Sequence, residues 1–210
     1  MNREAIAGWQ RRDFLGGATL LALALGIPAA AVSLSDLPAQ DVPSDRQRAL
    51  LRTVSQLVIP RTETPGAGDV GTGDFVLIAL AHGLEGSRKP MAQDAVRPTL
   101  RHLRADGSLD HAAWLEGELD QRVEGDFLAL PGQSQVTALT ALDTQAFAPD
   151  AGDHPWKTIK ALVLTGYYTS ETGGAKELRY ELVPGRYDPD VPLKPADRAF
   201  SSDWTAVDFG

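Results

Sequence analysis

Hydrophobic residues recur at helical spacing from residue 44 onward. Ser44 stands three residues before Gln47, which is the spacing of an N-terminal capping box. The apolar positions that follow recur at helical intervals: Leu50, Leu51, Val54, Leu57 and Val58. Pro60 then interrupts the pattern, because proline lacks an amide proton and clashes with the preceding helical turn. The segment predicts an amphipathic helix that starts after Ser44 and stops before Pro60.

Further helices are predicted along the rest of the chain. Their apolar or helix-forming positions fall within 75–81, 91–104, 109–123, 131–147 and 155–168. Pro98 must kink the second of these segments, whereas Pro155 suits the first position of the last. We therefore expect a mainly α fold, an irregular helical bundle of about six helices that occupies residues 44–168.

The pattern changes after residue 168. Residues 169–210 contain a Gly-Gly pair and four prolines, and only 178–183 alternate as a strand would. This composition predicts a long extended C-terminal tail. Because a structureless tail of this length rarely stands alone in solvent, we expect it to pack on the body, on a partner or on both.

The first 31 residues read as an export signal. Arg11, Arg12, Phe14 and Leu15 match the twin-arginine pattern R-R-x-F-L, and an uncharged run from Phe14 to Val32 follows. Ala29 to Ala31 offers a small-residue cleavage site, so residues 1–31 predict a twin-arginine signal peptide. The run is also just long enough to span a bilayer, which leaves an uncleaved anchor as the alternative. Residues 32–43 are expected to be a polar linker.

Composition narrows the classes of function. The 210 residues contain 20 Lys and Arg against 28 Asp and Glu, a formal net charge of −8. An acidic surface repels phosphate backbones, so we expect no nucleic-acid partner. The chain has no cysteine, which excludes disulfides, thiolate metal ligands and a cysteine nucleophile.

No combination of residues predicts catalysis. The run Gly66–Gly71 fits G-x-G-x-x-G, but a helical pattern precedes it where a dinucleotide fingerprint requires a strand. The four histidines share no metal-ligand spacing, and His82 is expected to be a core histidine of an apolar helix. No G-x-S-x-G elbow is present. We predict no catalytic, cofactor-binding or metal site in this chain.

Aromatic and charged residues near the C-terminal turns are candidates for a protein interface. Large rings and arginine on rigid turns often anchor protein contacts. The candidate residues are Tyr167, Tyr168, Glu171, Arg186, Tyr187 and Trp204. The alternative is that the rings cover the chain's own helical core.

Three blocks of sequence resemble the gluconate 2-dehydrogenase subunit 3 family. The first is the leader around Arg11 and Arg12. The second is Leu57-Val58-Ile59-Pro60 with Thr62, Thr64-Pro65-Gly66-Ala67, Gly71 and Phe75, and the third runs from Leu164 through Tyr168 and Glu171 to Pro184-Gly185-Arg186-Tyr187. Members of this family are small, non-catalytic subunits of membrane-associated flavin dehydrogenases.

The resemblance implies an accessory role. In such complexes a glucose–methanol–choline type flavoprotein oxidises a sugar or sugar acid, and a cytochrome c subunit often accepts the electrons. The small subunit binds and stabilises the flavoprotein, which holds the FAD, and escorts it through the twin-arginine translocase. We therefore expect a periplasmic protein, held at the inner membrane through its complex where one forms. The alternative is a free-standing periplasmic helical protein that binds a small ligand or another folded partner.

Overall fold

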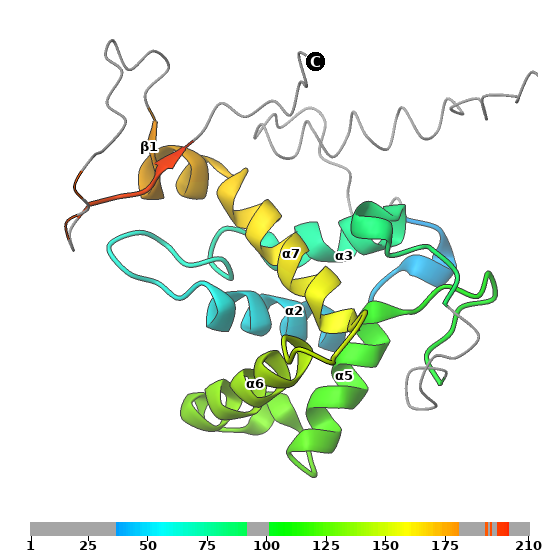
Figure 1. Cartoon of the computed structure of the whole chain (residues 1–210). Coiled ribbons are helices and arrows are strands. Elements are labelled where there is room, and N and C mark those ends of the chain that lie inside the picture. The colour runs from blue at the N-terminus through cyan, green and yellow to red at the C-terminus, as the bar shows by residue number, and fades with distance from the viewer. Residues whose placement is uncertain (1–36, 92–100, 181–191, 193, 195–196, 202–210) are drawn as a thin grey trace, which may run out of the picture.

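The computed structural model describes residues 37–91, 101–180, 192, 194 and 197–201. Its α-helices are α2 (Asp45–Val58), α3 (Thr72–His82), α5 (His111–Arg122), α6 (Gly132–Ala146) and α7 (Pro155–Tyr168). Short 3₁₀ segments are η3 (Ala39–Asp41), η4 (Leu84–Gly86) and η5 (Phe127–Ala129). A π-helical segment, η6 (Thr172–Glu177), follows α7, and β1 (Arg179–Tyr180) pairs in parallel with β2 (Phe200–Ser201). The predicted mainly α fold is confirmed (Figure 1).

Local sequence signals set the helix ends. Ser44 and Gln47 form the predicted capping box, in which the Ser44 hydroxyl accepts from the Gln47 amide at 3.1 Å. The Gln47 side chain accepts from the Ser44 amide in return, at 2.9 Å. Pro155 occupies the first turn of α7, where its missing amide proton costs nothing because that amide has no helical acceptor.

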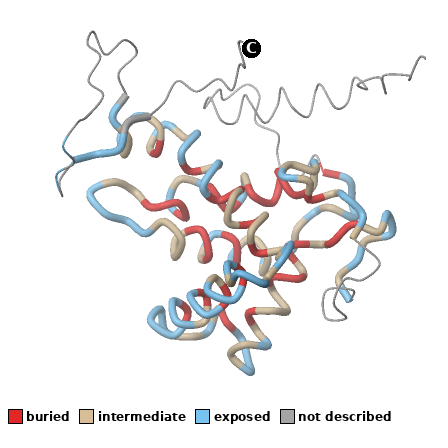
Figure 2. Tube along the Cα trace, viewed as in Figure 1, coloured by how far each residue is buried: buried red, intermediate tan, exposed pale blue. Residues whose placement is uncertain are grey.

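The core is built around α2 and α7, with α3 packed against both of them. Each of these two helices contacts every other described α-helix, and buried residues concentrate where they meet (Figure 2). The fully buried side chains include Leu50, Leu51 and Val54 from α2 and Ile159, Leu162 and Val163 from α7. Because burial of one such side chain stabilises a fold by about 1.5 to 3 kcal/mol, the packing of α2, α3 and α7 against one another contributes much of the body's stability.

Arg46 joins α2 to α5 at the edge of this core. Its guanidinium donates to Glu116 at 2.6 Å, to Asp120 at 2.5 Å and to Asp126 at 2.7 Å. Asp120 also accepts from the Phe127 amide at 2.9 Å, which holds η5 against the same site. One cation therefore fixes the relative position of α2, α5 and the following loop.

The expected linker is wrong over residues 37–43. Leu37 is 7% exposed and belongs to the hydrophobic core, and the side chain of Asp41 is 3% exposed between two arginines. This part of the chain therefore packs on the body, because it carries one apolar and one charged anchor. Residues 32–36 lie outside the described residues.

The predicted helix over 91–104 is wrong at its C-terminal end. Residues 101–110 form a tight turn in which Leu103 bridges Leu109 in antiparallel fashion. Asp106 supports the turn, since its carboxylate accepts from both the amide and the hydroxyl of Ser108. Residues 92–100 lie outside the described residues.

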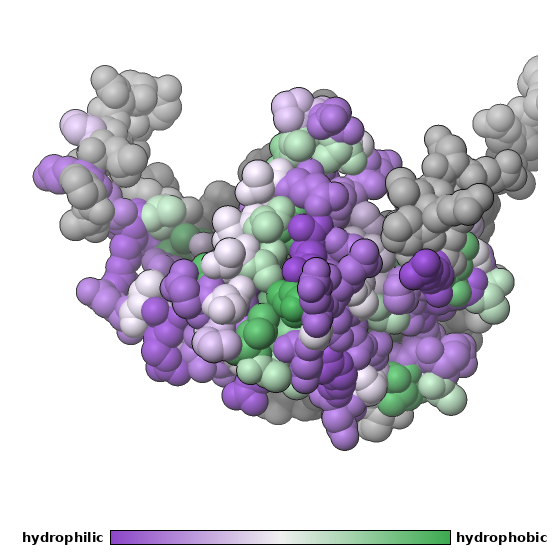
Figure 3. Space-filling model, turned by 90° about the horizontal axis from the view of Figure 1, so that it is seen from below, coloured by the Kyte–Doolittle hydropathy of each residue, from purple (hydrophilic) through white to green (hydrophobic). Residues whose placement is uncertain are grey.

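Helices α5 and α6 differ in the charge of their exposed residues. Within α6 only Asp143 is charged, and its exposed positions are Thr, Ala, Gln, Ser, Gly and Val. The neighbouring α5 carries Glu116, Glu118, Asp120 and Arg122. Seen from below, a pale to green band accordingly lies beside a strongly hydrophilic one (Figure 3).

Candidate partner-binding surface

The loop between α2 and α3 folds back on α2. Helix α2 ends at Val58, and the Ala67 amide then donates to the Ile59 carbonyl at 2.9 Å, which closes the loop. Asp69 supports the closure, because its carboxylate accepts from the Gly66 amide at 3.0 Å. Together with the ion pair to Arg61, these contacts lower the pKa of Asp69 against the opposing effect of burial.

Glycines in this loop and in the first turn of α3 permit close packing against α2. A Cβ atom at Gly68 would lie 2.6 Å from the carbonyl oxygen of Arg52, and one at Gly73 would lie 2.7 Å from the Arg52 nitrogen. Gly71 adopts a positive φ of 81° as the N-cap of α3. The G-x-G-x-x-G run thus follows a helix and serves helix packing, which is not the context of a dinucleotide fingerprint.

Tyr167 connects this loop to the end of α7. Its hydroxyl donates to the Pro65 carbonyl at 3.0 Å and lies 3.5 Å from the Thr64 hydroxyl. The Thr64 hydroxyl in turn donates to the carboxylate of Glu177 in η6. Two blocks that are a hundred residues apart in sequence, the loop after α2 and the end of α7, therefore form one structural unit, which we call the loop–tail junction (residues 59–71 and 167–177).

The prediction that Tyr167 anchors a partner is wrong in this structure. Its side chain is 1% exposed, so its ring belongs to this chain's own core. The spacing Trp156, Ile159, Val163, Tyr167 places it on the buried face of α7, and that periodicity could have identified it.

The other predicted anchors have different positions. Tyr168 is 40% exposed and packs edge-on against Tyr167, with ring centroids 5.2 Å apart. The side chain of Glu171 is 78% exposed beside Lys176, whose hydrogen bond lowers the pKa of that carboxyl. Arg186, Tyr187 and Trp204 lie outside the described residues, so their interface role stays a prediction.

The structure adds two exposed apolar residues to Tyr168. Leu164 lies one helical turn before it and is 38% exposed, and Phe147, just beyond α6, is 55% exposed. The ammonium groups of Lys157 and Lys160 approach the Phe147 ring, at 5.6 and 4.8 Å from its centroid. Because Lys160, Leu164 and Tyr168 are four residues apart, they share one side of α7.

We call Phe147, Lys157, Lys160, Leu164 and Tyr168 the α7 outer face. Helix α7 contains no acidic residue, although the chain as a whole is acidic. The face combines exposed rings, an aliphatic side chain and cations, which suits contact with another protein. Sequence reasoning missed Phe147 and Leu164, because their apolar periodicity also fits a buried position.

The histidines and acidic residues were candidates for a metal site. No set of three His, Asp or Glu side chains among them could hold a metal ion. His111 is the buried histidine, and burial lowers its pKa to about 4, so the ring is neutral and bonds the Leu109 carbonyl at 3.1 Å. The expectation of a core position for His82 is wrong, since it is exposed at the end of α3.

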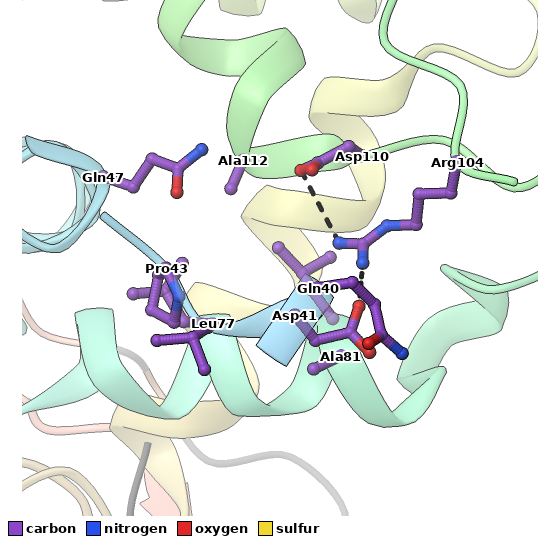
Figure 4. A pocket seen from close by; sticks show the side chains of 11 residues that line it. Gln40, Asp41, Pro43, Gln47, Leu77, Ala81, Arg104, Asp110 and Ala112 are labelled. Carbon is purple, nitrogen blue, oxygen red and sulfur yellow. Dashed lines mark hydrogen bonds and ion pairs between the residues drawn. The ribbon is translucent and has the colours of Figure 1, made fainter. Parts of the chain in front are cut away.

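A small pocket lies between η3 and the body. Its volume is about 30 Å³, and Asp41, Leu77, Arg104 and Asp110 are among its lining residues (Figure 4). Sites for small organic ligands usually enclose about 300 to 1,000 Å³, so this pocket is too small for such a ligand. In the part of the chain that the structure describes, none of the helices has the length and apolar character needed to cross a membrane.

The comparison with known proteins gives one match. Residues 45–185 match the family described as gluconate 2-dehydrogenase subunit 3. No curated protein and no solved structure was found to match the chain. The matched range contains the whole second block noted in the sequence and the third block as far as Gly185, and it includes both halves of the loop–tail junction.

Proposed function

We propose that this chain, which belongs to the gluconate 2-dehydrogenase subunit 3 family, binds, stabilises and escorts a flavin-dependent dehydrogenase as its non-catalytic small subunit. The family match over residues 45–185 is the observation that carries the proposal. The partner is a glucose–methanol–choline type flavoprotein that holds the FAD and oxidises a sugar or polyol. A cytochrome c subunit is the further partner that such a complex uses for electron transfer.

The twin-arginine leader supports export together with the partner. The pathway transports proteins that are already folded, so a leader on this chain can carry a bound flavoprotein that lacks one. Export places the complex in the periplasm, and a membrane-bound cytochrome subunit holds it at the inner membrane. The chain's part in this process is recognition of a folded protein surface, which requires no cofactor of its own.

The surface that we assign to the flavoprotein is the α7 outer face with the adjoining loop–tail junction. Leu164 and Tyr168 expose apolar area at its centre. The side chains of Glu171 and Lys176 surround it with charge and are 78% and 58% exposed. An apolar centre inside a polar rim is the usual anatomy of a specific interface.

Co-purification tests this assignment directly. The tagged full-length chain is purified from the cells that naturally produce it, and the flavin recovered with it is measured by absorbance. Tyr168→Ala should weaken binding by about 2 kcal/mol, the lower limit for a hot-spot residue. Val136→Ala on α6 is the matched control, because Val136 is also 40% exposed and should leave binding unchanged.

The result also separates the two candidate functions. Stoichiometric flavoprotein with the wild-type chain and its loss with Tyr168→Ala support the proposal. If both variants lose the flavoprotein equally, or if neither loses it, the α7 outer face is not part of the interface. Recovery of the chain without any flavoprotein favours the free-standing binding protein.

A twin-lysine variant tests the export step. Arg11→Lys with Arg12→Lys retains both charges but removes the planar guanidinium groups. Fractionation should then find this chain and the flavoprotein in the cytoplasm. Normal export of both proteins by this variant would refute the twin-arginine assignment.

A further inference from the structure

Asp41 is the most deeply buried acidic side chain in an ion pair of the described residues. It lies at the end of η3, and its carboxylate accepts from Arg88 at 3.0 Å and from Arg104. Figure 4 shows Arg104 extending over it from the opposite side of the pocket. Its side chain is only 3% exposed, so both contacts form largely out of water, where charge-assisted hydrogen bonds are strong.

The two arginines belong to the folded body. Arg88 follows η4 and Arg104 lies in the turn before α5, and each has a second carboxylate nearby. Arg88 is 3.4 Å from Asp106, and Arg104 is 3.6 Å from Asp110. The body therefore balances these two cations with its own two carboxylates, and Asp41 adds to a site that is already neutral.

Leu37 provides a second anchor four residues earlier. It is 7% exposed and contacts the hydrophobic core, and between the two anchors the Asp41 amide donates to the Pro38 carbonyl at 2.7 Å. Residues 37–43 are thus held on the body by one apolar and one ionic contact. The first described residue of this segment lies six positions after Ala31, where the leader is predicted to be cleaved.

We propose that residues 37–43 are a latch that closes on the folded body and fixes the root of the leader there. Six residues span at most about 20 Å when fully extended, so only a short segment separates the latch from the predicted cleavage site. The binding site for Asp41 forms only when residues 84–91 and 101–110 come together, because Arg88 and Arg104 belong to these separate segments. A closed latch thereby distinguishes a folded chain from an unfolded one.

The consequence for export rests on the proposed function, whereas the latch itself does not. In a folded chain the latch holds the segment that joins the leader to the body, whereas in an unfolded chain it does not. A pathway that transports folded proteins would therefore meet a leader held in this way only on folded chains. Asp41 acts in this scheme as a positioning residue, since it contacts only the body of its own chain.

Thiol labelling of the full-length chain tests the latch. The chain has no cysteine, so Leu37→Cys introduces a single buried reporter. Its labelling should be slow, and the additional change Asp41→Asn should accelerate it at least tenfold, because the amide replaces a charged acceptor. The change Asp45→Asn alters charge equally at an exposed position in the first turn of α2 and should leave the rate unchanged.

Circular dichroism and hydrogen exchange complete the test. The helical signal of Asp41→Asn should match that of the wild type, and exchange of peptide 37–43 should accelerate without the cysteine reporter. An unchanged labelling and exchange rate in Asp41→Asn would overturn the latch. Loss of helical signal in parallel would also overturn it, since the segment would then be an inseparable part of the fold.

Fractionation tests the consequence for export separately. With an intact leader, Asp41→Asn should lower the exported fraction several-fold relative to Asp45→Asn. If Asp41→Asn is exported at the wild-type level, the latch has no role in export, even where labelling confirms that it closes. Normal export of the twin-lysine variant would instead refute the proposed pathway, and the labelling result would still stand.

Discussion

Replacement of Tyr167 distinguishes a core residue from a partner anchor. Tyr167→Phe removes the hydroxyl that donates to the Pro65 carbonyl at 3.0 Å and leaves that part-buried acceptor without its partner. The net value of such a bond is about 1 kcal/mol, and an orphaned acceptor costs about 1 to 3 kcal/mol. We therefore expect the free energy of unfolding to fall by about 1 to 2 kcal/mol.

Tyr167→Ala removes the ring as well. The side chain is 1% exposed, and truncation of a buried aromatic residue costs about 3 to 5 kcal/mol because it leaves a cavity. Tyr168→Phe is the matched control, because its ring is 40% exposed at the next position of the same helix. A surface change of this kind should alter stability by no more than about 0.5 kcal/mol.

Urea unfolding followed by far-UV circular dichroism measures these differences. Tyr167→Phe should lower the midpoint without a change in slope, and Tyr167→Ala should lower it further. In a chain of this length each kcal/mol corresponds to about 2 to 4 °C in melting temperature. The reasoning is refuted if Tyr167→Phe and Tyr168→Phe are equally stable and only the former loses the flavoprotein.

Three further changes test other parts of the fold by the same unfolding assay. Gly73→Ala should destabilise the chain by about 2 kcal/mol or more, because its Cβ would lie 2.7 Å from the backbone of Arg52. Gly132→Ala, at an exposed position, is the control, and a smaller loss of stability at Gly73 than at Gly132 would contradict the prediction. Arg46→Ala should lower the free energy of unfolding by about 1 to 2 kcal/mol, and by less at high salt, because its three ion pairs are part-exposed. A loss of stability that does not depend on salt would indicate that packing of the side chain is responsible instead. Below about pH 6.5 the unfolded chain binds a proton at His111, whereas the folded chain does so only near its lowered pKa of about 4. Stability should therefore decrease between these values as pH falls, by up to about 3 kcal/mol, and His111→Gln should flatten that decrease; an equal slope in both proteins would show that His111 is not responsible.

The sequence by itself determined five helices of the body, the start of α2 and α7, and the family, although it failed at residues 101–104. Helix periodicity, the Ser44 capping box and the position of Pro155 are local signals between residues three or four apart, so they survive without knowledge of the fold. The arginine pair with the uncharged run that follows it and the blocks around Pro60 and Tyr168 are local patterns in the same sense. Each of these features can be identified from one short segment at a time.

Only the tertiary structure decided which side chains are available to a partner. Tyr167 and Tyr168 are adjacent in sequence, yet one donates to the Pro65 carbonyl in the core and the other lies at the surface. Asp41 likewise appeared to belong to a polar linker, because its arginine partners lie 47 and 63 residues away. Burial and ion pairing depend on which distant segments meet, and helix periodicity carries no information about residues so far apart along the chain.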